Sequence, residues 1–166
     1  MKIPELTMYH PNGKGTGSAI KLELHPAHDD TAGSIMATIA TQLTTGNCIG
    51  SVPIYPQFDW KGAITVKLDF TDISKMLQVF RGECESLEDG RGLFHLSTRG
   101  TTKIMLRHVV EPIHGYMLEV YRTMRDSDDS NARIFLSPYE ALGLATAIES
   151  SMGVICFGIP MVIPNV

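Results

Sequence analysis

The spacing of apolar residues changes along this chain from alternation to a helical repeat, and it does so twice. From residue 64 to residue 70 every second residue is apolar, which is typical of a strand with one buried side. From residue 71 to residue 82 the apolar spacing becomes i, i+3, i+4 and i+7, which predicts one buried helix face. The apolar residues of that face are Ile73, Met76, Leu77 and Phe80. A second series of alternating segments leads into another predicted helix at Ser137, so the chain is predicted to contain two units of strands followed by a helix.

Both predicted helices have recognisable ends. Thr71 is a suitable N-cap, Asp72 complements the positive end of the helix dipole, and Gly82 follows the last apolar position. The second helix starts with the sequence S-P-Y-E at Ser137–Glu140, which combines an N-cap serine, a first-turn proline and the glutamate of a capping box. This second helix is predicted to end at Gly153.

The remaining alternating segments predict the strands of each unit. The first unit has predicted strands at residues 19–25, 34–43 and 60–70, with a short edge strand at 51–55. The second unit has predicted strands at residues 93–98, 101–110, 116–125 and 132–136. Residues 1–17 contain two prolines, Asn12 and three glycines, and are predicted to be irregular.

Each helix can bury one apolar stripe against one sheet face, which leaves the opposite face of that sheet polar. We therefore predict an antiparallel α+β fold made of two pseudo-repeats, residues 13–82 and 91–153. Residues 1–12 are predicted to form an irregular N-terminal segment and residues 161–166 a C-terminal tail.

Composition excludes several classes of protein. With 166 residues, 43% of them hydrophobic, the chain is an ordinary globular protein with no apolar run of the length that a membrane span needs. No apolar segment follows Met1, so we expect no secretory signal. The three cysteines, Cys48, Cys84 and Cys156, form no C-x-x-C pair, which favours a reducing, cytoplasmic location over a disulfide framework.

The net charge of −4 argues at first against a partner that is held by bulk positive charge. However, nine of the 18 acidic residues lie in three predicted turns, at 29–30, 83–89 and 126–129. Outside these turns the 14 lysines and arginines outnumber the nine remaining acids. Basic strand faces are therefore compatible with an acidic total, although acidic residues also prefer loops for solvation alone.

Nothing in the sequence points to catalysis, a cofactor or a metal. Nucleophile elbows and zinc-protease motifs are absent, and the glycine-rich segment 13–17 lacks the G-K-[ST] ending of a phosphate-binding loop. His25, His28, Asp29 and Asp30 have a spacing that could hold a metal, but a solvated turn explains them better. We therefore expect a protein that is not an enzyme.

Polar, basic and aromatic residues lie on the predicted outward side of several strands. In the first unit these include Lys21, Lys61 and Lys67, and in the second Lys103, Arg107 and Tyr121. Bases stack on aromatic rings while lysine and arginine follow phosphates, so such surfaces suit single-stranded nucleic acid. The alternative is that these are the ordinary solvated faces of an antiparallel sheet.

The order of several short motifs resembles that of the Whirly family of single-stranded DNA-binding proteins over residues 13–160. The first segment, G-K-G-T-G-S-A at 13–19, is similar to the family's K-G-K-A-A-L, although one of its two lysines is missing here. Similar matches are Phe58-Asp59-Trp60 to Y-D-W, Leu93-Phe94-His95 to F-F-H, and residues 66–73 to F-x-L-S-x-x-E-[IV]. The end of the chain, Phe157-Gly158-Ile159-Pro160, lacks the family's tryptophan.

This resemblance implies a single domain over residues 13–160 with two antiparallel four-stranded sheets, each followed by a helix (ββββα-ββββα), as in the related PC4-type coactivators. It implies a homotetramer that binds single-stranded DNA with little sequence preference, in DNA maintenance or transcription. The residues implied to contact DNA are Lys14, Lys21, Trp60, Lys61, Lys67, Lys103, Arg107 and Tyr121.

Several alternatives remain open at this stage. Trp60 could instead anchor the core, Tyr121 could cover a subunit interface, and Phe94 and His95 are expected to pack inside. An RNA-binding scaffold of the same fold is the nearest alternative function. The other is a structural protein that uses these faces only for self-assembly.

Overall fold

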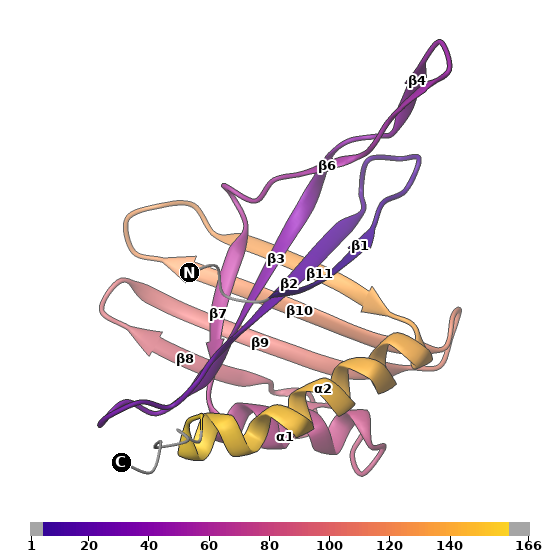
Figure 1. The fold of residues 1–166 in the computed structure, drawn as a ribbon. Helices are drawn as coiled ribbons and strands as arrows, with labels where there is room; N and C mark the ends of the chain where they lie inside the picture. Colours follow the sequence, from indigo (N-terminus) through magenta and orange to yellow (C-terminus); the bar gives the residue numbers. More distant parts are fainter. Residues whose placement is uncertain (1–4, 160–166) are drawn as a thin grey trace, which may run out of the picture.

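The computed structural model describes residues 5–159, which form two crossed antiparallel sheets with two helices along one end (Figure 1). The first sheet has the order β1-β2-β3-β6, with β7 also paired to β3, and the second has the order β11-β10-β9-β8. The strands of the first sheet are β1 (Glu5–His10), β2 (Ser18–His25), β3 (Ser34–Thr44), β6 (Gln57–Phe58) and β7 (Ile64–Leu68). Those of the second are β8 (Leu93–Ser97), β9 (Gly100–Val109), β10 (Gly115–Met124) and β11 (Ser130–Leu136). The helices are α1 (Phe70–Phe80), the short 3₁₀ helix η1 (Leu87–Gly90) and α2 (Pro138–Phe157).

The two sheets pack against each other through their apolar faces and share one core. Ile20 and Ile39 of the first sheet are fully buried, as are Ile104, Leu106 and Ile134 of the second. Each such side chain contributes about 1.5–3 kcal/mol to stability relative to an exposed one. Helices α1 and α2 close the core by burying one side each. The predicted alternation is confirmed for Ile64, Val66 and Leu68, which are buried. It is wrong for Phe70, which the same pattern placed inward, because β7 ends at Leu68 and Phe70 is the exposed first residue of α1.

The ends of the helices differ in part from the prediction. Helix α1 begins at Phe70 with Asp69, not Thr71, as its N-cap: Asp69 accepts a hydrogen bond from the backbone N–H of Asp72, which accepts one from Asp69 in return. Asp69 and Asp72 thus form at α1 the same kind of reciprocal cap that the sequence predicts for Ser137 and Glu140 at α2. At α2 the capping box of Ser137 and Glu140 is confirmed. This helix continues past Gly153 to Phe157, because one interior glycine costs only about 1 kcal/mol.

The N-terminal segment is not irregular. Residues 5–10 form β1, which pairs with β2 from Glu5↔Glu23 to His10↔Ser18. The prediction relied on Pro4, Pro11 and Asn12, which mark only the ends of this strand. The fold class is confirmed as antiparallel α+β, but the first unit is larger than four strands, since β4, β5 and β6 are inserted between β3 and β7. The predicted tail at 161–166 lies outside the described residues.

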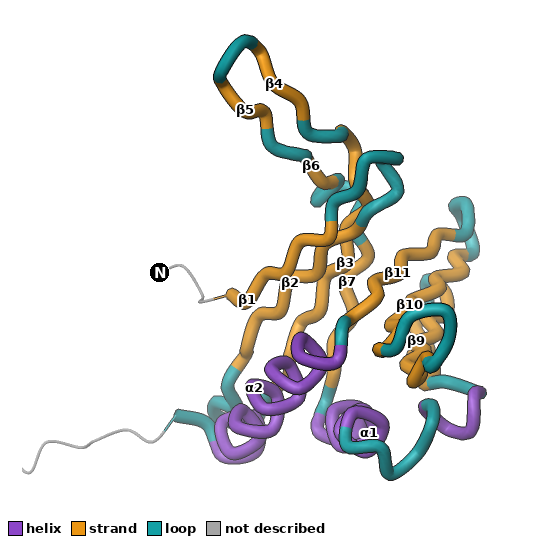
Figure 2. The backbone as a smooth tube through the Cα atoms, turned by 90° about the vertical axis from the view of Figure 1, so that its right-hand side faces the viewer, coloured by secondary structure: helices purple, strands orange, loops and turns teal. Residues whose placement is uncertain are grey.

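The insertion between β3 and β7 forms a hairpin that leaves the body of the protein. Strands β4 (Asn47–Ile49) and β5 (Val52–Ile54) pair only with each other. Figures 1 and 2 both show this hairpin extending away from the two sheets. The predicted edge strand at 51–55 is therefore one half of a projecting hairpin. We call residues 45–56 the arm.

Helix α2 is apolar on almost every side. By length and composition it could cross a membrane, with a mean hydropathy of 1.3 over 18 residues. One side of it, including Ala141, Leu144 and Ile148, is buried in the core of this domain. Tyr139 and Leu142 remain exposed on the other side. The helix is thus a structural part of the domain with an uncovered apolar side.

Candidate nucleic-acid interface

The polar sides of the two sheets point away from each other. Because both sheets bury their apolar rows in the shared core, their polar rows lie on opposite outer surfaces. Figure 2 shows the backbones of the two sheets next to each other. The first outer face, on β1, β2, β3 and β7, carries Lys21 and Lys67, with Trp60 and Lys61 beside it. The second outer face, on β8–β11, carries Lys103, Arg107 and Tyr121. The predicted site residues therefore form two groups within one chain.

The first outer face holds a hollow lined by aromatic rings, which we call the aromatic cup. Tyr9, Tyr55, Phe58 and Trp60 line it together with Pro11, Pro56 and Gln57, and its volume is about 610 Å³. The ring of Tyr9 lies 5.5 Å from that of Phe58 and 6.4 Å from that of Trp60, the latter edge to face. Trp60 is 38% exposed, so the alternative that it anchors the core is wrong. The cup is open to solvent and wide enough for a nucleobase.

The register of the first sheet explains where the cup lies. Tyr9 is opposite Ala19 on β2, and Ala19 is opposite Ala40 on β3. Two small side chains in this row leave room above the sheet for large rings. The backbone N–H of Asp59 donates to Thr41 O, which holds the segment carrying Phe58 and Trp60 over the end of β3. The cup thus combines Tyr9 of β1 with residues of the segment between the arm and β7.

The positive charge of Lys21, which lies beside the cup, is partly neutralised by two carboxylates. Lys21 Nζ lies 5.9 Å from the centre of the Trp60 ring, within the range of a cation–π contact. The same atom is 3.7 Å from Glu5 and 3.6 Å from Glu23. Lys61 is exposed in the turn after Trp60. Two carboxylates therefore compete with a phosphate for Lys21.

Lys14 lies in the turn between β1 and β2, which is tightly held. Asn12 Oδ1 accepts hydrogen bonds from the backbone N–H groups of Lys14 and Thr16. The buried Gln42 binds this turn from β3, since its Oε1 accepts from the N–H groups of Asn12 and Gly17. The turn therefore presents the Lys14 side chain to solvent from an ordered backbone.

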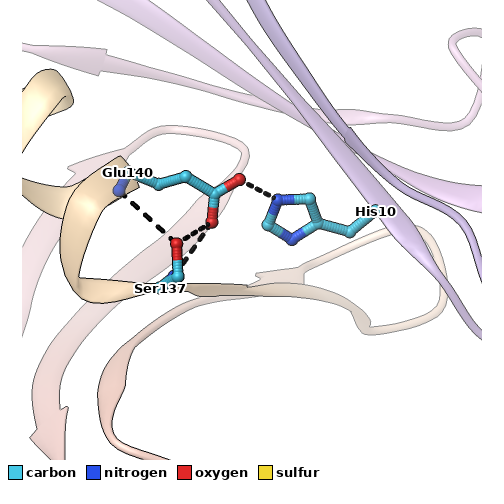
Figure 3. A network of polar contacts seen from close by, with 3 residues as sticks. All are labelled: His10, Ser137 and Glu140. Carbon is cyan, nitrogen blue, oxygen red and sulfur yellow. Dashed lines mark hydrogen bonds and ion pairs between the residues drawn. The ribbon is translucent and has the colours of Figure 1, made fainter.

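Strand β1, which supplies Tyr9 to the cup, is fastened to α2 by a polar network (Figure 3). His10 Nε2 is 2.7 Å from Glu140 Oε1, while Ser137 donates to Glu140 Oε2 through both its hydroxyl and its backbone N–H. Burial alone raises the pKa of Glu140, but the hydrogen bonds from Ser137 and His10 outweigh it and lower the pKa below its usual value. The glutamate that caps α2 thus also positions β1.

The second outer face carries a cross-strand row of Phe94, Lys103 and Tyr121 on β8, β9 and β10. Phe94 is 56% exposed, and its ring centre lies 5.4 Å from Lys103 Nζ. The expectation that Phe94 packs inside is wrong, because it belongs to the outward row of an edge strand. Among residues 5–159 no carboxylate pairs with Lys103. This row offers two exposed rings with a free cation between them.

Arg107 and Tyr121, which also lie on the second outer face, are both held by contacts to Glu119. Arg107 Nε is 3.7 Å from Glu119, and the Tyr121 hydroxyl donates to the same carboxylate at 3.3 Å. Burial, together with the charge of Glu119, raises the pKa of Tyr121. Tyr121 is therefore a neutral ring at physiological pH and suited to stacking.

His95 alternates with Phe94 and points to the inner side, as expected. Its Nε2 lies 2.9 Å from Asp72 Oδ2, and Asp72 already accepts the Asp69 N–H in the α1 cap. The pair is thus part of a helix cap. It parallels His10 and Glu140 at α2, so each helix start uses a carboxylate and a histidine from a strand.

A basic cleft of about 340 Å³ lies between β7 and the strands of the second sheet. Its lining includes Lys67, Arg99, Arg122 and His95. Arg122 is fixed by hydrogen bonds to Thr65 O and Thr102 Oγ1. The cleft thus lies where β7 meets the second sheet, and Lys67 belongs to both the cleft and the first outer face.

Sequence reasoning missed several residues that the structure places at these sites. Tyr9, Tyr55 and Phe58 of the cup are not among the contact residues predicted from the sequence: Tyr9 falls in the segment predicted to be irregular, Tyr55 in a predicted edge strand, and Phe58 in a motif from which only Trp60 is taken as a contact. Arg122 of the basic cleft occupies an inward position of β10, two residues after the buried Val120. An arginine at a position where the alternation of β10 predicts a buried apolar residue is a signal by which Arg122 could have been recognised.

In the described part of the chain, no group of three histidine, cysteine, aspartate or glutamate side chains is placed to hold a metal ion. His28 Nδ1 lies 3.6 Å from Asp29 at an exposed turn between β2 and β3. The four residues considered from the sequence, His25, His28, Asp29 and Asp30, therefore do not form such a group.

No protein-family model matches the sequence, and no curated protein matches it significantly. Solved structures do match its fold over most of its length. WHY1 from Arabidopsis thaliana superposes with a TM-score of 0.72 at 15% identity, covering 95% of this chain and 87% of the other. WHY3 from the same plant gives 0.69 at 16% identity, covering 93% and 89%. The plant transcriptional regulator PBF-2 gives 0.67 at 18% identity, covering 93% and 83%. The fold is therefore that of the Whirly proteins, as the sequence resemblance implied.

Proposed function

We propose that this protein binds single-stranded nucleic acid, specifically DNA with little sequence preference. The observation that carries this proposal is the aromatic cup, which exposes the rings of Tyr9, Phe58 and Trp60 beside lysines on the outside of a sheet. Every base has a π-face, so stacking there is tolerant of sequence and contributes about 1–3 kcal/mol per base. The shared fold with a plant transcriptional regulator supports a role in DNA maintenance or transcription.

The two outer faces would act in different ways along one strand of nucleic acid. Bases would stack in the cup, with Lys14 and Lys61 close to the phosphates that leave it. The backbone would then cross the basic cleft past Lys67 and reach the row of Phe94, Lys103 and Tyr121. This path needs no catalytic group, and we propose that the protein acts as a binding protein and not as an enzyme.

We also propose that the protein forms a homo-oligomer, with four subunits as the sequence resemblance implies. The uncovered side of α2 supports this, because Tyr139 and Leu142 are exposed there on an apolar helix. In such an assembly the first outer face of one subunit could meet the second outer face of its neighbour. Both groups of site residues would then contact the same strand.

Titration of a fluorescently labelled oligothymidine, followed by anisotropy at two salt concentrations, tests the proposal. We expect saturable binding at low salt and a linear fall of log K with log salt, since phosphate neutralisation releases counterions. The matched duplex should bind more weakly, because its bases are not free to enter the cup. No binding of the single strand at low salt would contradict the proposal and favour a purely structural self-assembly protein.

Competition with an RNA oligonucleotide of the same sequence tests the choice of DNA. The two ligands differ systematically in the 2′-hydroxyl. We expect RNA to compete no better than DNA, since the cup presents rings and not hydrogen-bonding groups aimed at a sugar. Stronger competition by RNA would replace DNA by RNA as the ligand of the same faces.

A further inference from the structure

The arm exposes a row of aliphatic side chains on one of its two sides. In the β4–β5 pairing Ile49 is opposite Val52 and Asn47 is opposite Ile54, so these four residues share a side. Ile49 is 71% exposed and Val52 64%, and Ile54 is also exposed. Two-stranded hairpins are marginally stable when they are isolated in water. An arm with these side chains is therefore expected to be covered by a partner.

The edges of the arm are unsuited to pairing with further strands. Pro53, in the middle of β5, has no backbone N–H to donate to a neighbouring strand. On β4 the backbone N–H of Cys48 is occupied by the Asn47 side chain at 2.8 Å. Because neither edge offers a free backbone N–H group at these positions, the arm is unsuited to strand pairing. We therefore expect it to contact a partner through its aliphatic side.

The arm also lacks the charges that contact with phosphate would need. No lysine, arginine, aspartate or glutamate occurs between Asp30 and Asp59, a segment that includes the whole arm. Proteins that follow a nucleic-acid backbone do so with lysine and arginine. The chemistry of the arm thus favours an apolar protein surface as its partner.

Such a surface exists on this chain. An apolar groove of about 280 Å³ lies between the first sheet and α2, lined by Leu6, Leu22, Leu24, Ile35, Leu144 and Ile148. A cavity of ~150 Å³ accommodates benzene, so this groove has room for two or three aliphatic side chains. Its polar rim consists of Glu5 and Ser151. Groove and arm are thus matched in polarity and in size.

The arm cannot reach the groove of its own subunit. Ile35 lies at the start of β3 and Thr44 at its end, where the arm begins, which separates them by about 30 Å at 3.3 Å per residue. From its first residue, 45, to its tip at Gly50, the arm is only about 20 Å long by the same measure. Figure 1 shows the arm directed away from α2. Contact between the two therefore requires two molecules.

We propose that the arm of one copy of this chain inserts Ile49, Val52 and Ile54 into the apolar groove of a second copy. The exchange covers the arm and fills the apolar part of the groove, and the Glu5 carboxylate stays at its rim. It does not depend on the nucleic-acid function, since Ile49, Val52, Ile54 and the residues of the groove are not part of the cup, the cleft or the Phe94 row, although the base of the arm also carries Tyr55 and Pro56 of the cup.

A cross-linking experiment between two differently marked proteins tests this contact. The first protein keeps Cys48 on the arm and has Cys84→Ala and Cys156→Ser. The second carries Ser151→Cys at the groove rim and has Cys48→Ser, Cys84→Ala and Cys156→Ser. After mixing and treatment with a short bis-maleimide, we expect the mixed adduct to form in preference to adducts of either protein with itself.

Two arm variants show whether the contact is specific. Ile49→Asp with Ile54→Asp in the first protein should reduce the mixed adduct about tenfold or more, since it would bury unpaired carboxylates in the groove. Ile113→Asp, at an equally exposed position between β9 and β10, should leave it unchanged. Because the arm lies outside the core, these changes leave the fold intact, which circular dichroism can verify.

Three results would overturn the proposal. One is a mixed adduct that is insensitive to Ile49→Asp and Ile54→Asp, which indicates random collision. Another is preferential formation of a Cys48–Cys48 adduct, which indicates arms that meet tip to tip. The third is the absence of any adduct. As a measurement on otherwise unmodified protein, solution mass against concentration should show weaker association for the double arm variant.

Discussion

The two outer faces combine rings and charges in opposite proportions. On the first, Tyr9, Phe58 and Trp60 form a cup, but its nearest lysine, Lys21, is shared by Glu5 and Glu23. On the second, the rings are fewer and more spread out, but Lys103 has no acidic partner in the described part of the chain. Under the proposed function, the first face would mainly stack bases and the second would mainly neutralise phosphates.

The net charge of −4 fits this division. A protein that relied on charge alone would need more basic residues than these faces carry, and its affinity would depend steeply on salt. Stacking depends little on salt. We therefore expect changes on the first face to alter affinity at every salt concentration and changes on the second to alter the salt dependence.

The largest effect is expected from Tyr9→Ala combined with Trp60→Ala. Loss of one stacked base costs about 1–3 kcal/mol, so oligothymidine affinity should fall by about that amount or more at every salt concentration. The slope of log K against log salt should stay the same. Phe157→Ala, which removes an exposed ring at the end of α2, should have no effect on binding. Equal losses for both variants would contradict the assignment of the cup.

A smaller effect, on stability, is expected from Glu140→Gln, which weakens the network holding β1 and Tyr9 to α2. The loss should be about 1 kcal/mol at neutral pH. Because the folded state lowers the pKa of Glu140, its contribution is complete above the unfolded value of 4.5 and disappears as pH falls through the folded value. Urea unfolding should therefore separate the wild type from Glu140→Gln at pH 7 and bring them together in acid. A constant difference across this range would contradict the role of the carboxylate.

Lys103→Gln should weaken binding modestly and mainly at low salt. Loss of one phosphate contact reduces the salt slope by about 0.7 for a single strand. Lys75→Gln removes the same charge from α1, where Lys75 pairs with Glu88, and should leave the slope unchanged. Similar slopes for the two variants would show that Lys103 does not contact phosphate.

The smallest effect, and one of opposite sign, is expected from Glu23→Gln. It releases Lys21 from one of its two carboxylates, so binding should become slightly tighter and the salt slope slightly steeper. Glu83→Gln, in the loop after α1, is the control for net charge. If both variants tighten binding equally, the gain comes from net charge and not from Lys21.

The second unit could be predicted from the sequence almost residue by residue, and the first could not. Strands β8–β11 are joined in order by turns, so alternation and turn residues locate each of them. In the sequence, prolines 4 and 11 flank the six residues of β1, and a segment with this composition is predicted to be irregular. The strands of the arm do not pack on the core, since all their residues are exposed. They therefore lack a row of buried apolar residues, which is the pattern by which a strand is recognised in a sequence.

The candidate site shows the same limit. Outward lysines follow directly from alternation, so Lys21, Lys67, Lys103 and Arg107 were identified with the correct side of their strands. The cup joins Tyr9 to Phe58 and Trp60 across about 50 residues of sequence, through a contact that depends on the path of the insertion. Local patterns carry no information about such a path. The basic cleft likewise depends on how the two sheets cross.

Fluorescence of Trp60 tests the central claim most directly. It is the only tryptophan of the chain, so its emission reports on the aromatic cup alone. If bases stack in the cup, addition of unlabelled oligothymidine should quench this emission, and the quenching curve should saturate at the same ligand concentration as the anisotropy curve. Binding seen by anisotropy with unchanged Trp60 emission would contradict the account, because the nucleic acid would then lie elsewhere on the protein.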